Sequence, residues 1–245
     1  MSAFAHAYLS DTWNRDKVMA IVQFLPMALE GPVRNAGCDS LAVSLGNLSK
    51  MADAYRAVTR LSLVLNALSS KTLTALAKPG EDAFVRRLDQ VSHAFHIGFC
   101  LNEHTAVLAG RGVFNSGLAR LGGVAVLCWF YTLVVGLVRQ VYLLAKHSPN
   151  GPCKVLMPGD ANDTKVVPYT HEECKRAVVN LVKLSLFTVF SMTCLPDGKP
   201  QLLQEPCSFL MPLHQLVRAL APNKLNLSDT VRGLFAVTAS LCDFY

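Results

Sequence analysis

Charged side chains are scarce in this sequence. Asp, Glu, Lys and Arg account for 16% of its 245 residues, whereas they make up about 25% of ordinary soluble chains. Hydrophobic residues reach 51%, and the mean hydropathy is +0.32. This composition argues against an ordinary soluble domain and favours a protein that resides in a membrane.

The sequence also has no basic block, although its cations outnumber its anions. Lys and Arg exceed Asp and Glu by 23 to 17, which gives a scattered net charge of +6 at neutral pH. The aromatic and basic motifs of the usual nucleic-acid-binding modules are missing. We therefore expect no nucleic-acid partner, and we expect the excess positive charge to meet the anionic lipids of a membrane surface.

No two cysteines form a C-x-x-C pair. The eight cysteines are spread singly along the chain, at positions 38, 100, 128, 153, 174, 194, 207 and 242. This spacing argues against a disulfide framework or a zinc knuckle and fits reduced thiols in an intracellular protein. The opening residues carry no basic segment followed by an apolar run, so we expect no cleaved secretory leader.

The motifs of common enzyme classes are missing as well. The sequence contains no G-x-x-x-x-G-K-[ST], G-x-S-x-G or H-E-x-x-H. Glu103 precedes His104, but the spacing identifies no nucleophile and no orienting partner for acid–base chemistry. We therefore expect no enzymatic activity and no cofactor.

One helix face invites a zinc interpretation. Its ligand-type residues fall at i, i+3, i+7 and i+11, and they are His93, His96, Cys100 and His104. A straight helix separates the first from the last by about 16 Å, whereas zinc ligands lie about 2.0–2.3 Å from the ion. At most an adjacent pair could share a metal with a ligand from elsewhere, and we expect no metal site.

Helical periodicity dominates the chain, and no alternating pattern or Asn-Gly turn signals a β-hairpin. We predict an all-α fold: a multi-helix membrane protein with amphipathic interfacial helices and one firm transmembrane helix. The first helix follows residues 10–17, and Pro26 should kink or end it within a turn. Its apolar residues form a single stripe that would insert into a membrane or, as the alternative, pack on neighbouring helices, and they are Val18, Ile21, Val22, Leu25 and Leu29.

A second amphipathic helix is predicted over about residues 45–76. One face is apolar and consists of Met51, Tyr55, Val58, Leu61, Leu65 and Leu68. The other face carries Asp53 and four cations, which are Lys50, Arg56, Arg60 and Lys71. Two interpretations stay open, because such a face packs on neighbouring helices or sinks into one leaflet of a membrane. In the second case the cations would contact lipid headgroups, each contributing about 1 kcal/mol.

Residues 121–138 contain no charge and lie between Arg120 and Arg139. As a helix they would extend about 27 Å, close to the roughly 30 Å thickness of the hydrocarbon layer. We predict a membrane span at about residues 120–142; the alternative is the central helix of a soluble bundle. Small residues in this helix would permit close helix contacts and a homo-oligomer, and they are Gly122, Gly123, Ala125 and Gly136.

The span completes a first region, residues 1–146, which also contains a helix over about residues 82–113. Residues 147–170 are rich in Pro, Gly, Asn and Asp and read as a polar loop. Residues 171–245 are predicted to form C-terminal helices, with a candidate second membrane segment near 227–245. Asn226 or Ser228 is placed to cap the last of these helices.

Four stretches resemble a known family, the peroxisome-proliferating peroxins (the eleventh peroxin), and most closely its glycosomal integral-membrane branch in trypanosomatids. "NRDKVMAIVQFLPMAL" is similar to the family's opening helix, which contains Gln before an aromatic residue. "LSKMADAYRAVTRLSLVLNAL" resembles its basic amphipathic helix, with Arg56 and Arg60 at the paired-arginine positions. "FHIGFCLNEHTAVLAGRGVF" resembles its aromatic-rich helix with a Glu-His pair. "GLFAVTASLCDFY" is similar to its Gly- and Ser-containing C-terminal segment.

The resemblance implies a protein of the peroxisomal or glycosomal membrane with both termini in the cytosol. The implied function is membrane shaping that promotes the elongation, proliferation and division of these organelles, through insertion of amphipathic helices and self-association. Anionic lipids, organelle fission machinery and the peroxisomal membrane-protein import receptor are the implied partners. Two other functions stay open: a pore for small metabolites, lined by Arg139 and Gln140, and a scaffold that recruits fission proteins.

Overall fold

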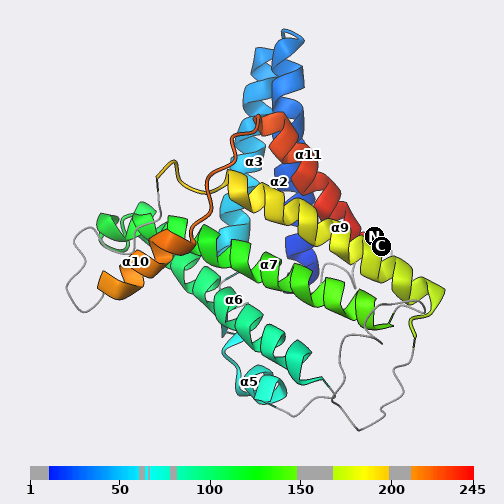
Figure 1. Cartoon of the computed structure of the whole chain (residues 1–245). Coiled ribbons are helices and arrows are strands. Elements are labelled where there is room, and N and C mark those ends of the chain that lie inside the picture. The colour runs from blue at the N-terminus through cyan, green and yellow to red at the C-terminus, as the bar shows by residue number, and fades with distance from the viewer. Residues whose placement is uncertain (1–10, 61–63, 66, 78–81, 148–167, 199–210) are drawn as a thin grey trace, which may run out of the picture.

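The computed structural model describes residues 11–60, 64–65, 67–77, 82–147, 168–198 and 211–245 (Figure 1). These residues contain helices and no strand, which confirms the all-α prediction. The elements are α2 (Thr12–Asn35), α3 (Asp39–Thr59), α5 (Ser70–Ala77), α6 (Ala83–Gly110), η1 (Ser116–Arg120), α7 (Leu121–His147), α9 (His171–Thr193), α10 (Met211–Leu220), α11 (Asp229–Leu241) and η2 (Cys242–Phe244).

Local side-chain chemistry explains where several helices begin. The Asp82 carboxylate accepts hydrogen bonds from the backbone N–H groups of Phe84 and Val85 and caps α6. Thr170 and Glu173 form a reciprocal capping box at the start of α9. Ser228, one of the two capping residues considered from the sequence, accepts from the Val231 N–H and begins α11.

The structure differs from two expectations about helix boundaries. Of the two alternatives for Pro26, an end of the first helix is wrong, because α2 continues through Pro26 and Pro32 to Asn35, whereas a kink at Pro26 stays a prediction. The buried side of α2 packs against α3 and α11, and this tertiary packing outweighs the lost backbone hydrogen bonds. The predicted helix over residues 45–76 is not continuous, since α3 begins at Asp39 and ends at Thr59, and a turn and bend at residues 68–69 precede α5. Leu61 and most of the predicted loop 147–170 lie outside the described residues.

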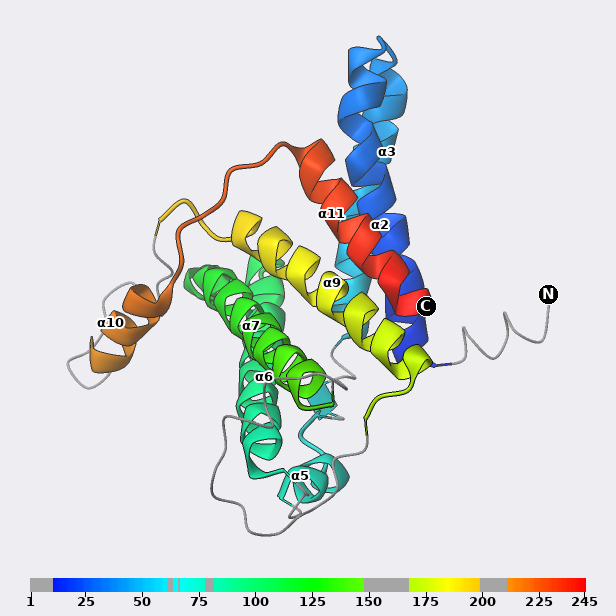
Figure 2. The same cartoon turned by 45° about the vertical axis from the view of Figure 1, so that its right-hand side comes forward.

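The helices form two groups that cross each other. In one group α6 and α9 pack on either side of α7; in the other, α2 packs between α3 and α11. α2 and α3 make a hairpin, whose turn uses Gly37 at φ +82°. Both views show this hairpin crossing the α7–α9 pair at a steep angle, with α11 lying between α2 and α9 (Figures 1 and 2).

Small residues line the contacts among α2, α3 and α11. Ala42 and Ala52 of α3 and Ala236 and Ala239 of α11 are fully buried. Gly233 lies so close to α2 that an added Cβ would come within 2.6 Å of Ala28 Cα. Backbones approach this closely in membrane proteins, where small residues replace large apolar ones between helices.

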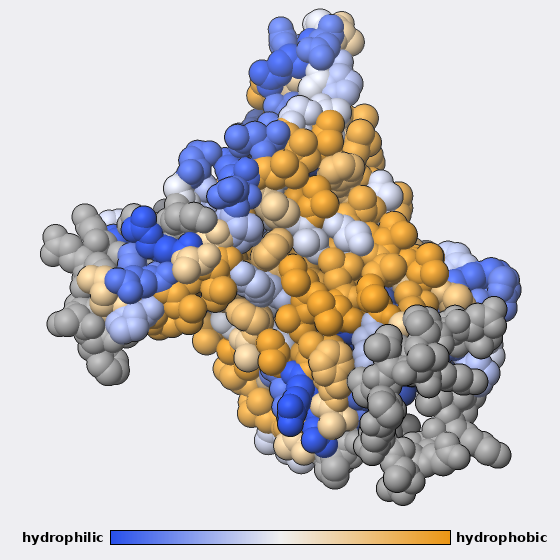
Figure 3. Space-filling view, in the orientation of Figure 1, coloured by the Kyte–Doolittle hydropathy of each residue, from blue (hydrophilic) through white to orange (hydrophobic). Residues whose placement is uncertain are grey.

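Two described helices are long and apolar enough to cross a membrane, by length and composition: Ser116–His147 and His171–Thr193. The first contains the predicted span, and the second is α9. α11 has 13 residues, about 20 Å of helix, and the predicted membrane segment near 227–245 stays a prediction. Figure 3 shows a broad apolar band over α7, α9 and α11, whereas the tip of the α2–α3 hairpin is hydrophilic.

Close packing of α11 on α2 predicts a large effect from one added methyl group. We expect Gly233→Ala to lower the free energy of unfolding by about 1–3 kcal/mol, because the methyl would overlap backbone atoms of Ala28. Gly110→Ala is the matched control, since no atom lies within 4 Å of the Cβ it would add. Thermal unfolding in detergent, followed by circular dichroism, compares the two; equal melting temperatures would contradict this packing.

Candidate membrane interface

The apolar stripe of α3 faces outward. Met51 is 64% exposed and Val58 is 67% exposed, and Tyr55 between them is also exposed. The buried side of α3, which packs on α2, instead consists of Ala42, Gly46, Ser49, Ala52 and Arg56. Leu65 and Leu68, beyond the end of α3, are exposed as well. The described part of the chain therefore leaves this stripe uncovered, which favours the lipid interpretation over bundle packing.

The predicted stripe of α2 is only partly outward. Leu25 and Leu29 are exposed, whereas Val18, Ile21 and Val22 are half-buried. The inner side of α2 uses Ala20, Phe24 and Ala28, and Phe24 packs edge-on against Phe190 of α9 with 5.1 Å between ring centroids. α2 is thus a packed helix with two outward leucines.

The four predicted headgroup-binding cations fall into two pairs. Lys50 and Lys71 are exposed, as a headgroup ligand must be. Arg56 is buried, and its guanidinium binds Asp16 of α2 through two contacts, Nε–Oδ1 at 2.9 Å and Nη2–Oδ2 at 3.1 Å. Its third nitrogen donates to Gln23 Oε1. Arg56 therefore joins α3 to α2, and the α2–α3 hairpin carries its own internal ion pair.

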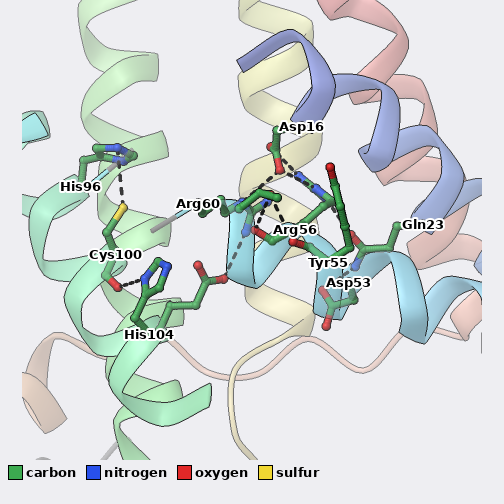
Figure 4. A network of polar contacts seen from close by, with 11 residues as sticks. Asp16, Gln23, Asp53, Tyr55, Arg56, Arg60, His96, Cys100 and His104 are labelled. Carbon is green, nitrogen blue, oxygen red and sulfur yellow. Dashed lines mark hydrogen bonds and ion pairs between the residues drawn. The ribbon is translucent and has the colours of Figure 1, made fainter. Parts of the chain in front are cut away.

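Arg60 extends this network to a third helix (Figure 4). Its Nε lies 3.3 Å from Asp16 Oδ1, and its Nη1 donates to Glu103 Oε1 of α6 at 3.1 Å. The guanidinium also lies 5.9 Å from the ring centroid of Phe99. The Arg60–Glu103 bond therefore links the end of α3 to α6, which packs beside the predicted span.

The two carboxylates of the network differ in their environment. Burial alone would raise the pKa of Asp16, but the bonds and positive charges of Arg56 and Arg60 outweigh it and lower this pKa. Burial raises the pKa of Glu103 more than Arg60 lowers it. The second oxygen of Glu103 also has no hydrogen-bond partner among the described residues. Asp16 is thus the stronger anchor, and Glu103 is bound at one oxygen.

Sequence reasoning identified the arginines but missed their partners. The sequence pattern marks Asp16 and Gln23 only as parts of a motif and Glu103 only as the neighbour of His104, and it predicts lipid headgroups as the ligands of the arginines. One signal could have found the partners: in a chain with few charges, a carboxylate on a largely apolar helix must meet a cation to be buried. The headgroup role of Arg56 and Arg60 stays a prediction, since in this conformation both side chains bind carboxylates inside the protein.

The His and Cys residues considered for zinc make contacts along α6 or with nearby backbone. His96 Nε2 lies 3.7 Å from Cys100 Sγ, His104 Nδ1 lies 2.6 Å from the Cys100 carbonyl, and His93 Nε2 lies 3.0 Å from the Ala67 carbonyl. Among the described residues, no three His, Cys, Asp or Glu side chains gather in a group that could hold a metal ion.

Polar side chains on α7 bind neighbouring helices. Arg139 pairs with Asp89 of α6 at 2.7 Å, and Gln140, which is buried, accepts a hydrogen bond from Asn180 of α9 at 2.9 Å. These are the two side chains considered for a pore. Two of the small residues considered for self-association instead contact other parts of the same chain. Ala125 is buried, and a Cβ added at Gly136 would lie 3.4 Å from Leu184 of α9.

One family model matches nearly the whole chain. Its description is Peroxisomal biogenesis factor 11 (PEX11), and it covers residues 3–245. No curated protein and no solved structure matches the chain. The four stretches that carry the resemblance meet in the fold: Asp16 and Gln23 come from the first, Arg56 and Arg60 from the second, and Glu103 from the third. Gly233, from the fourth, packs on the same helix as Asp16.

The buried ion pair predicts unequal effects for two arginines of the α2–α3 hairpin. We expect Arg56→Met to lower the free energy of unfolding by about 3–5 kcal/mol, because it leaves Asp16 buried with only part of its partners. Arg34→Met should cost less than about 0.5 kcal/mol, since Arg34 is half exposed and pairs with Glu30 one turn away. Chemical denaturation in detergent measures both, and similar losses would show that the Arg56 network does not hold the hairpin.

Proposed function

The chain belongs to the peroxisomal biogenesis factor 11 family, which acts in peroxisome proliferation and division, and we propose that it does so by shaping the membrane through its α2–α3 hairpin. The family is associated with the peroxisomal membrane, and it is not a known enzyme family. The outward apolar stripe of α3 is the observation that carries the proposal. Lipid is the solvent that suits such a surface.

The orientation of the hairpin supports insertion into one leaflet. If α7 and α9 stand across the membrane, the hairpin crosses them and does not run parallel to the membrane normal (Figures 1 and 2). An amphipathic helix in this orientation sinks its apolar side among the acyl chains of one leaflet. That leaflet then expands relative to the other, and the membrane curves.

The polar network gives the wedge a fixed position. Arg56 holds α3 on α2, and Arg60 connects the pair to α6. Because the stripe is attached to a membrane span, it stays close to the membrane surface. Its insertion is then an intramolecular event with a high effective concentration. In this proposal the arginines position the inserting helix, and the exposed Lys50 and Lys71 attract anionic headgroups, each contributing about 1 kcal/mol.

The proposal also includes the topology of the chain, its organelle, its self-association and its protein partners. We place the termini in the cytosol and extend the site of action to glycosomes on the basis of the resemblance. Self-association would spread the wedge over a larger area; because Ala125 is buried and Gly136 already meets Leu184, we expect it to use other surfaces of the chain. Fission machinery and the membrane-protein import receptor remain the expected protein partners.

Reconstitution into vesicles tests the proposal directly. We expect the full-length protein to tubulate vesicles of phosphatidylcholine and phosphatidylserine, and Val58→Asp to reduce the tubulated fraction several-fold, because a charge on the stripe opposes insertion. Electron microscopy of the vesicles measures the fraction.

Val113→Asp is the matched control, since Val113 is 64% exposed and lies outside the stripe, in the turn after α6. It should tubulate like the unsubstituted protein. Equal tubulation by Val58→Asp would refute insertion of this stripe. Conductance across planar bilayers that Arg139→Ala alters, without tubulation, would instead favour the metabolite pore.

A further inference from the structure

One charge lies well inside the second candidate span. Apart from Lys183, α9 has no Asp, Glu, Lys or Arg after Arg176. Lys183 follows Ala177 by six residues, about 9 Å, and precedes Thr193 by ten, about 15 Å. A lysine inside a span lowers the ratio of inserted to uninserted helix, by about a hundredfold at the centre of the span and by less toward its ends. Insertion of α9 therefore requires that this charge be neutralised or moved to the interface.

The partner of Lys183 comes from the segment after α11. Lys183 Nζ donates to Asp243 Oδ1 at 3.1 Å, and both side chains are mostly buried, at 24% and 22% exposure. Asp243 belongs to η2, which packs on both α9 and α11. The carboxylate therefore approaches α9 only when α11 and η2 are folded against it.

Two contacts set the height of this pair in the bundle. Asn180 binds Gln140, and Leu184 lies against Gly136, so α9 is held in an antiparallel register with α7. This register places Lys183 about level with Arg139, which has its own carboxylate partner in Asp89. Each of these two cations inside the apolar helices is thus matched by an anion from another element.

We infer that Asp243 is the counter-ion that allows α9 to cross the membrane. When paired, Lys183 and Asp243 enter the bilayer as a neutral hydrogen-bonded unit, whereas Lys183 alone would enter it as an unpaired ammonium group. The second crossing is then completed only when residues 229–244 dock on α9. This inference depends on α9 as a span and does not rest on the shaping function.

Labelling of the two ends of α9 tests the inference. Full-length chains without other cysteines would carry either Cys174, which is exposed before the apolar part of α9, or Asp197→Cys, which follows it. A membrane-impermeant maleimide is added to sealed vesicles. In the otherwise unsubstituted chain we expect one position to react and the other to be protected. Asp243→Asn should make the protected position reactive, because α9 no longer crosses.

Suppressor variants separate neutralisation from misfolding. Lys183→Leu together with Asp243→Asn, and the exchange Lys183→Asp with Asp243→Lys, should both restore protection of one end. Asp229→Asn is the matched control, because Asp229 pairs with Arg232 at the start of α11 and its side chain is 72% exposed. It should leave protection unchanged.

Three outcomes would overturn the inference. Protection that persists in Asp243→Asn would mean that Lys183 reaches the interface by itself. Loss of protection that neither suppressor restores would mean that Asp243 acts through folding alone. Reaction at both positions of the otherwise unsubstituted chain would show that α9 does not cross. Tubulation is measured separately, so a failure here leaves the shaping proposal to its own test.

Discussion

The need to neutralise buried charge organises this structure. In an apolar environment an unpaired guanidinium or carboxylate is strongly destabilising. Removing one partner of a buried ion pair therefore lowers the stability of the fold by more than the intact pair contributes to it. Arg56 and Arg60 therefore meet Asp16 and Glu103, and these four side chains come from three helices. Because the bonds are directional, they decide which side of α3 faces inward. The apolar stripe is left on the outside as a consequence.

Small residues make that arrangement stable without a large apolar core. Alanines on α2, α3 and α11, together with Gly233, allow the backbones to come close, and dispersion contacts over this short distance hold the hairpin and α11 together. The larger apolar side chains of α3 are then not needed between the helices and face outward, where the proposal places lipid. Met51 and Val58 are among the most exposed large hydrophobic side chains of the described residues.

The same rule applies along the two candidate spans. Arg139 with Asp89, Lys183 with Asp243, and Gln140 with Asn180 are polar pairs between different elements. Each polar pair fixes how its two elements are aligned along their length, because apolar helix surfaces by themselves do not favour one alignment over another. The hairpin itself is held across the two candidate spans by other contacts, the Arg60–Glu103 bond and the packing of α11 on both α2 and α9, and these contacts give the proposed wedge its orientation relative to the bilayer.

Composition and periodicity determined by themselves the helical class, a helix over residues 121–138 that is long and apolar enough to span a membrane, and the apolar stripe that the structure places outward on α3. Local chemistry also determined the starts of helices, as at Ser228. The end of α3 at Thr59 and the passage of α2 through Pro26 were decided by tertiary packing, which outweighs local propensity. The carboxylate partners of Arg56 and Arg60 were decided there too. Periodicity predicts which face of a helix a residue occupies, but it does not predict which distant carboxylate will lie opposite that face. Asp16 and Glu103 lie 40 and 43 residues from their partners, and only the folded chain brings them together.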